Sequence, residues 1–448
     1  MGPDLQDLAG ALIDAAKSAG ANAADALVAK GTSVAIDVRQ GKLEHAERSE
    51  GIDLGLRVLI GQKQANVSIS ETRADSIREM AERAVAMARE APDDPHIGLA
   101  DPDQIARDWD IAALELADPT PEPAPSALQD DAARAEAAAL ANDRISQVQA
   151  ASAGYSSSEV FLAASNGFAG GYRRTDRGIS CVAIAGCGSD MERDYDGDTR
   201  IFQSDLRTPE DIGATAASRA VDRHGASQPP TGTFPVLFDE RISSSLIGHL
   251  LAAVNGAMIT RGSSWLRDAL GDQVLPSGLT LSEDPHRPRV SGSRPFDAEG
   301  LATRKRDIVA DGMLTGWTLD LANARKLGMA STANAARGVS SPPSPTSWNI
   351  NLTQGVASRD ELVVQMGTGL LVTSLIGSTI NPTTGDYSRG ASGFWIENGK
   401  IVRPVNECTI AGNLRDMLRD IIPANDARTH LSRVVPSLLV EGMTIAGT

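Results

Sequence analysis

An Asn-Gly dipeptide between two short apolar runs is the strongest structural signal in this sequence. Asn398-Gly399 separates the run FWIE from the run KIV. Asn-Gly readily adopts the two positive φ angles of a type I′ turn, which joins adjacent antiparallel strands. Asp311-Gly312 repeats the pattern between IVA and ML. The two hairpins predict that the second half of the chain is rich in antiparallel strands.

In the first half, helical and strand patterns alternate. Apolar residues at helical spacing predict a helix over residues 4–19. Alternating apolar and polar residues predict a strand over 53–60, with a hairpin partner over 64–70. Thr-Pro at 208–209 predicts the start of a helix that ends near Gly225, because Thr caps helices and Pro suits their first position. The first half therefore mixes helices and sheet.

Two segments without periodicity divide the chain. A chain of 448 residues exceeds one ordinary core, since domains usually hold about 100–200 residues. Residues 117–125, ADPTPEPAP, form a Pro-rich connector within the first half, and residues 226–233, ASQPPTGT, have the composition of a linker. We predict a two-domain α+β protein. Its N-terminal domain spans 1–225, and its C-terminal domain, mainly antiparallel sheet, spans 234–448.

An acidic segment, GCGSDMERDYDGD, occupies residues 186–198. Its glycine and its acids do not match the spacing of an EF-hand loop, so we interpret it as a solvated turn. Short strands are predicted before it, at 159–163 and 179–185, with a turn at Asn166-Gly167 between them.

Composition excludes several classes of function. The net charge of −16 and the pI near 4.9 oppose binding to a nucleic-acid backbone. Three cysteines, at 181, 187 and 408, are too few for a disulfide framework. The first residues lack the basic segment of a secretion signal, and no apolar run reaches the length of a membrane span. We expect a cytoplasmic protein that does not enter a membrane.

Catalytic residues are hard to find in this chain. The six histidines show no paired spacing suited to a metal, and no Gly-x-Ser-x-Gly motif is present. Asp239 and Glu240 could act as a general acid and base. A helix start favours acids in any case, so a structural role explains this pair as well. The residues alone predict no metal site.

Residues 381–413, NPTTGDYSRGASGFWIENGKIVRPVNECTIAGN, closely resemble a signature of the TldD/PmbA family, in its PmbA (TldE) branch. The resemblance covers nearly the whole chain. It extends to the segments 165–172, 186–195, 307–317 and 436–447. It implies a two-domain α+β fold and a partner, because PmbA-type chains form a heterodimer with a TldD-type zinc metallopeptidase.

The resemblance also locates the catalytic motif. TldD-type chains carry His-Glu-x-x-x-His after the strand that opens the C-terminal half, and a cysteine near the C-terminus completes the zinc site. Here Ser244 takes the place of the first histidine, Ser245 that of the general-base Glu, and His249 that of the second histidine. No cysteine lies in residues 416–435, and Cys408 lies too early to take that role. We expect no catalytic residue and no bound metal in this chain, with zinc in its partner.

The resemblance therefore implies the non-catalytic half of a peptidase that cleaves small unfolded or leader peptides. Such a chain would shape the chamber that an extended peptide enters. Three alternatives stay open: a self-sufficient metallopeptidase with unusual ligands, a peptide-binding module without peptidase activity, and a redox role for the cysteines. The redox role is the weakest, since no Cys-x-x-Cys motif is present. Homodimerisation in the absence of the partner also stays open. Polar and glycine residues of the signature are our candidates for the channel lining: Asn381, Thr384, Gly385, Asp386, Ser388 and Gly393.

Overall fold

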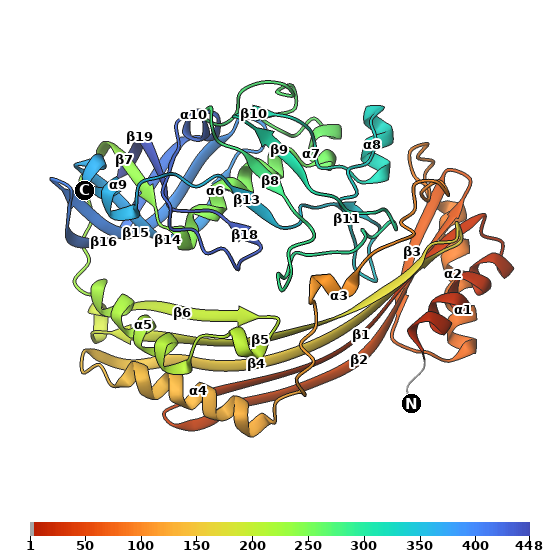
Figure 1. The fold of residues 1–448 in the computed structure, drawn as a ribbon, viewed down its shortest axis with the longest axis horizontal. Coiled ribbons are helices and arrows are strands. Elements are labelled where there is room, and N and C mark those ends of the chain that lie inside the picture. Colours follow the sequence, from red (N-terminus) through yellow and green to blue (C-terminus); the bar gives the residue numbers. More distant parts are fainter. Residues whose placement is uncertain (1–3) are drawn as a thin grey trace.

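The computed structural model describes residues 4–448 and has an α+β architecture organised around two large sheets (Figure 1). This confirms the predicted fold class. The first sheet has six strands in the order β3-β2-β1-β4-β5-β6, and each neighbouring pair is antiparallel. Its strands are β1 (Ala23–Arg39), β2 (Lys42–Ile60), β3 (Lys63–Ile69), β4 (Ile145–Ala164), β5 (Ala169–Ala185) and β6 (Glu192–Arg200).

Helices cover one face of the first sheet in two pairs, one pair near each end (Figure 1). The sequence of β1 explains this arrangement, because alternate residues of a strand point to the same face. Ala24, Ala26 and Val28 pack against the first pair of helices, and the equivalent residues further along β1 pack against the second. The pairs are α1 (Leu5–Ser18) with α2 (Ala74–Glu90), and α4 (Pro125–Leu140) with α5 (Pro209–Asp222); α3 (Ile111–Leu114) is a short connector.

Two predictions for this sheet need correction. The central strands β4 and β5 are 20 and 17 residues long, far beyond the predicted segments 159–163 and 179–185. Their additional residues are mostly polar or small, and hydrogen bonding to two neighbouring strands keeps them extended. The solvated turn predicted over 186–198 is also wrong. Much of that segment belongs to β6, which buries Asp194, Asp196 and Asp198 on one face.

The second large sheet closes on itself. β7 (Gly232–Phe238) lies between β14 (Gly369–Ile380), which runs parallel to it, and β19 (Leu438–Ala446), which runs antiparallel. β15 (Asp386–Glu397) and β16 (Lys400–Asn413) continue the sheet from β14. β16 then pairs with β19 through three residues and closes a barrel. β17 (Ile422–Pro423) adds to the outer side of β19.

Both predicted hairpins are confirmed. Asn398 and Gly399 have φ angles of 51° and 71°, and Asp311 and Gly312 have 49° and 80°. The smaller sheet of this half has the order β10-β9-β8-β13-β18, with only β13 and β18 parallel. Its strands are β8 (Leu281–Glu283), β9 (Arg306–Ala310), β10 (Met313–Leu314), β13 (Ile350–Leu352) and β18 (Arg433–Val434), and β11 (Ala335–Ala336) pairs separately with β12 (Ser344–Pro345).

Helix α6 (Glu240–Ala253) packs against the closed sheet. Leu246, Ile247 and Leu250 of α6 share one apolar core with Val236 and Phe238 of β7. Within residues 4–448, no helix has the length and apolar character needed to cross a bilayer. The helices of this half are α6 (Glu240–Ala253), α7 (Gly256–Thr260), α8 (Leu321–Leu327), α9 (Arg359–Met366) and α10 (Leu414–Arg419).

The two halves are joined by buried charges. Asp25 of β1 accepts hydrogen bonds from Arg57 of β2 and from Arg337 of the second half. All three side chains are almost completely buried. Val339 packs so closely on β2 that a Cβ added at Gly55 would lie 2.3 Å from its carbonyl oxygen. The face of the first sheet opposite the helices is therefore turned toward the second half (Figure 1). The boundary at 226–233 stays a prediction.

Candidate functional site at helix α6

The carboxylate at the start of helix α6, that of Asp239, is occupied by a helix-capping hydrogen bond and by two ion pairs. Asp239 follows β7 as the N-cap, and its side chain accepts a hydrogen bond from the backbone N–H of Arg241 at 3.1 Å. The guanidinium groups of Arg241 and Arg359 pair with its two oxygens at 3.1 and 3.3 Å. Glu240 pairs with Arg428 at 2.6 Å, and burial raises the pKa of Glu240. These contacts favour the structural role of the Asp239-Glu240 pair.

The three motif positions lie together on α6. Ser245 donates its hydroxyl to the carbonyl of Ile242 at 2.7 Å, within its own helix. Ser244 and His249 are half-buried. Burial and the nearby Arg389 lower the pKa of His249, and its Nε2 has no hydrogen-bond partner within the part of the chain that the structure describes. The lowered pKa favours the neutral form of the half-buried His249 imidazole.

The surroundings of His249 do not fit a zinc ion. Arg389 is close enough to affect His249, and a Cβ added at Gly248 would lie 3.3 Å from Nη1 of Arg433. The positive charge of Arg389 would repel a dication at the ring. Serine hydroxyls are poor zinc ligands, since zinc prefers Cys, His and carboxylate groups. Across residues 4–448, no group of three or more such side chains is placed to hold a metal.

Cys408 has the environment of a structural thiol. It lies on β16, where its Sγ contacts the carbonyl of Ala391 at 3.2 Å. Burial raises its pKa to about 11. A metal-binding cysteine must give up its proton, which this setting opposes.

Four of the six channel candidates lie at the turn between β14 and β15, with Asp386 as the first residue of β15. The side chain of Asn381 accepts the backbone N–H groups of Thr383 and Thr384 at 3.0 and 3.3 Å. Asp386 accepts the hydroxyl of Thr384 at 2.6 Å and the amide of Asn413 at 3.1 Å, and these bonds lower its pKa. Gly385 has a φ of +84°, which favours glycine at this point of the turn.

The other two candidates lie further along β15. Ser388 pairs with Ala411 of β16 and is half-buried. Gly393 lies so close to β14 that an added Cβ would be 1.9 Å from the carbonyl oxygen of Leu371. Strand packing therefore accounts for glycine at 393. A role of the six residues in lining a channel stays a prediction.

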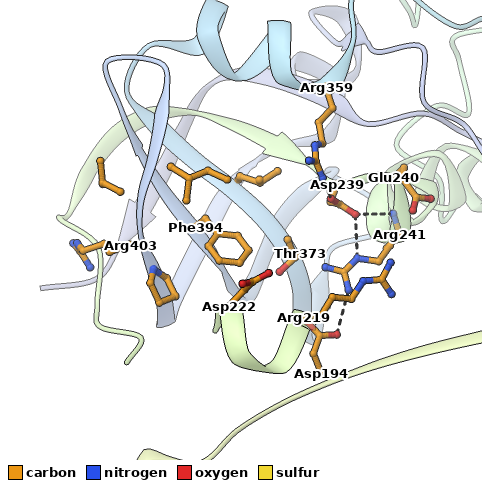
Figure 2. A pocket seen from close by; sticks show the side chains of 14 residues that line it. Asp194, Arg219, Asp222, Asp239, Glu240, Arg241, Arg359, Thr373, Phe394 and Arg403 are labelled. Atoms are coloured by element: carbon orange, nitrogen blue, oxygen red, sulfur yellow. Dashed lines mark hydrogen bonds and ion pairs between the residues drawn. The ribbon is translucent and has the colours of Figure 1, made fainter. Parts of the chain in front are cut away.

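A cavity of about 470 Å³ opens beside the start of α6. It lies where the edge of the first sheet meets the barrel, and Figure 2 shows Asp239 between the side chains of Arg359 and Arg241. Asp194 of β6 pairs with Arg241 at 3.2 Å across the junction. Apolar residues of β15, β16 and their surroundings complete the wall: Leu371, Phe394, Ile401, Val402 and Pro404. The cavity offers a polar, charge-balanced wall facing an apolar one.

Sequence reasoning missed this cavity because Asp194, which joins the wall across the junction, was assigned to a loop. Asp194, Asp196 and Asp198 occur at every second position of DYDGD, the period of a strand. Arg219 of α5 pairs with Asp196 at 2.8 Å. The alternation was the available signal, but acids are depleted in strands, and their arginine partners lie elsewhere in the sequence.

Sequence comparison defines the class of the protein. Models of the PmbA/TldA metallopeptidase family match domain 1 over residues 24–88, the central domain over 117–223 and the C-terminal domain over 231–447. The fold is thus that of a metallopeptidase family. The chain belongs to the PmbA/TldD family, in its PmbA/TldE branch, as the signature at 381–413 predicts.

Two curated relatives match over nearly their full length. The chain is 39% identical to Metalloprotease PmbA of Escherichia coli O157:H7, covering 95% of this chain and 92% of that protein. It is 36% identical to the Metalloprotease PmbA homolog of Haemophilus influenzae, covering 99% and 96%.

Solved structures share the fold. A proposed DNA gyrase modulator from Bacteroides thetaiotaomicron superposes with a TM-score of 0.91 at 27% identity, covering 99% of this chain and 98% of that one. TldE from Thermococcus kodakarensis superposes with a TM-score of 0.85 at 20% identity, covering 98% and 100%. The arrangement of both halves is therefore common to these proteins.

Proposed function

We propose that this chain is the non-catalytic subunit of a cytoplasmic heterodimer with a TldD-type zinc metallopeptidase. In this role it shapes the chamber in which small unfolded or leader peptides are cleaved. The observation that carries the proposal is the environment of His249. Ser244 and Ser245 stand where a zinc ligand and a general base are needed, and the positive charge of Arg389 acts on the ring. Without a base or a metal-bound water, hydrolysis of a peptide bond has no activated nucleophile.

Exposed apolar side chains on the barrel support a partner surface. Ile376 of β14 is 70% exposed, and Ile401 and Val402 of β16 are 52% and 49% exposed. Burial against another protein would remove these apolar side chains from water. The face of the first sheet that is turned toward the second half suits an extended peptide, since its central residues are small, such as Gly154 and Gly178.

A reconstitution experiment tests the proposal. The chain, a TldD-type partner and their mixture are each assayed for bound zinc and for cleavage of an unstructured peptide. We expect zinc in the partner and full cleavage only in the mixture. Light scattering on the isolated chain reports whether it also forms a homodimer. Cleavage by this chain alone would contradict the proposal.

A second measurement separates the alternatives. If the chain were a self-sufficient metallopeptidase, purified protein would hold one zinc per chain and a His249→Ala variant would lose it. A peptide-binding module without peptidase activity would bind the peptide but fail to co-purify with any TldD-type chain. We expect neither result.

A further inference from the structure

A second cavity, of about 430 Å³, lies between the first sheet and the second half of the chain. It shares no lining residue with the cavity at α6. Its floor is formed by alternate residues of β1, β4 and β5 that point away from the helices, among them Leu27, Val160 and Arg174. Segments of the second half provide the other wall, with Arg294, Phe296 and Trp348. Its volume lies within the range of small-molecule sites.

One wall of this cavity is aromatic and fixed in place. The ring of Phe296 contacts the rings of Trp109 and Phe168 edge-on, with centroids 5.0 and 4.9 Å apart. Tyr172 lies on the same ring at 5.7 Å. Such offset contacts hold the rings in a single arrangement. The wall can therefore receive an apolar group without first reorganising.

Two guanidinium groups meet at the other side of the cavity. Arg174 and Arg294 both donate to the carbonyl oxygen of Ser291, the latter at 3.1 Å, and Arg294 also donates to the carbonyl of Ser293 at 2.7 Å. Within residues 4–448, neither arginine has a carboxylate oxygen within 4.0 Å, although the chain carries a net charge of −16. The arginines around the start of α6, by contrast, are paired with acids.

Buried donors in this cavity also lack acceptors. Nη1 of Arg174 is buried with no hydrogen-bond partner in the described chain, and so is Nε of Arg337, whose side chain is 0% exposed. Leaving a charged donor unsatisfied is costly. Burial, followed by the neighbouring Arg294, lowers the pKa of Arg174, and the charge of Asp176 in the same wall opposes this shift only in part. Burial raises the pKa of Asp176 although both arginines lower it, so this acid is a weak counter-charge for them. Of the two acids in the wall, Asp297 already accepts backbone N–H groups of Glu299 and Leu301.

We propose that this cavity binds a carboxylate carried on an apolar group. The ligand class is an α-carboxylate with a large apolar side chain, from a single amino acid derivative or from the C-terminal residue of a peptide. The planar guanidinium groups of Arg174 and Arg294 suit paired hydrogen bonds to a carboxylate. The aromatic wall contacts the apolar side chain of the ligand. The site goes beyond the proposed function, because it needs neither the partner chain nor zinc.

Calorimetric titration of the isolated full-length chain tests the site. The probes are N-acetyl-phenylalanine, the tripeptide Ala-Ala-Phe, the C-terminal amides of both, and inorganic phosphate. We expect the free carboxylates to bind about tenfold or more tightly than the amides, and phosphate to bind weakly. Binding of the tripeptide alone would identify peptide C-termini as the source. Equal affinity for acids and amides, or tighter binding of phosphate, would overturn the proposal.

Variants assign the binding to the two arginines. Arg294→Gln and Arg174→Gln should each weaken N-acetyl-phenylalanine binding about tenfold or more. Arg173→Gln is the matched control, because Arg173 adjoins Arg174 on β5 but is exposed and donates to Ser157 at 3.1 Å. Arg294 is the decisive position if the Arg174 variant fails to fold. Unchanged affinity in Arg294→Gln, with the control also unchanged, would refute the site.

Discussion

The imidazole ring of His249 meets the phenol ring of Tyr387 edge-on, with centroids 5.8 Å apart and an angle of 73° between the planes. The contact joins α6, which carries Ser244, Ser245 and His249, to β15, which begins at Asp386. Residues 244–249 and the segment 381–413, far apart in the sequence, are thus neighbours in the fold.

The pH dependence of stability should report the burial of His249. Its pKa is lowered by burial and by Arg389, so protonation costs more in the folded state than in the unfolded chain. The stabilisation is complete above pH of about 6.5 and is lost as the pH falls toward the folded-state pKa. Urea unfolding at pH 7.5 and 5.5 should show a larger loss for the wild type than for His249→Phe. Equal losses would show that His249 is not the responsible group.

Removal of the carboxylate between the two halves should be strongly destabilising. Asp25→Ala leaves the guanidinium groups of Arg57 and Arg337 buried without their partner. We expect a loss of about 3–5 kcal/mol in the free energy of unfolding. Asp37→Ala on the same strand is the control, because Asp37 pairs at 3.5 Å with an exposed His45. A small effect of Asp25→Ala in urea unfolding would mean that water reaches the arginines.

Glycine at 393 should be irreplaceable for packing. An alanine Cβ would lie 1.9 Å from the carbonyl oxygen of Leu371, so β14 and β15 would have to separate. We expect Gly393→Ala to destabilise the protein by about 1–3 kcal/mol. Gly10→Ala in α1 meets no atom within 4 Å and should stabilise the helix by up to about 1 kcal/mol. Thermal unfolding of both variants distinguishes a tight strand contact from a general effect of alanine.

One thiol should react in the native chain. Cys187 is exposed, whereas Cys181 and Cys408 are buried and have pKa values raised to about 12 and about 11. Reaction with a thiol reagent at pH 8 should therefore modify Cys187 quickly and the other two only in denaturant. Cys187→Ser should abolish the fast phase. Fast reaction of a second thiol would indicate that the core around Cys181 or Cys408 opens readily in the native state.

The proposed partner surface can be tested on the barrel. Ile401→Glu places a charge on an exposed side chain of β16, so the isolated chain should remain folded. Association with a TldD-type chain should weaken about tenfold or more, since a charge buried in an interface is costly. Met87→Glu is a control, since Met87 is similarly exposed on α2, away from the barrel. Equal loss for both variants would point to a nonspecific effect of charge.

Local patterns predicted the elements whose sequence signals are independent of the rest of the fold. The helix capped by Thr208 and the turn at Asn398-Gly399 are examples, because each depends on backbone preferences of a few residues. The length of β4 and the strand at Asp194 were missed. There the extended chain is stabilised by pairing with distant strands and by arginines from α5 and α6, which no local pattern contains.

The site was predicted to a similar extent. Resemblance singled out Ser244, Ser245 and His249, and the structure places them on one helix. It adds Arg389, whose charge acts on His249, and Arg433, which lies beside Gly248. The cavity with Arg174 and Arg294 has no signal in the sequence, because its walls come from both halves of the chain and only the folded arrangement brings them together.

The order of strands in the barrel has a consequence for synthesis. β7 has β14 and β19 as its neighbours, and both follow it by more than one hundred residues in the sequence. During translation, β7 therefore leaves the ribosome before both of its partner strands. Its backbone edges stay unpaired until β14 and then β19 have been synthesised. Long-range pairing of this kind is slow to form. The hairpins of the first sheet can assemble earlier, which would give the barrel a finished surface on which to fold.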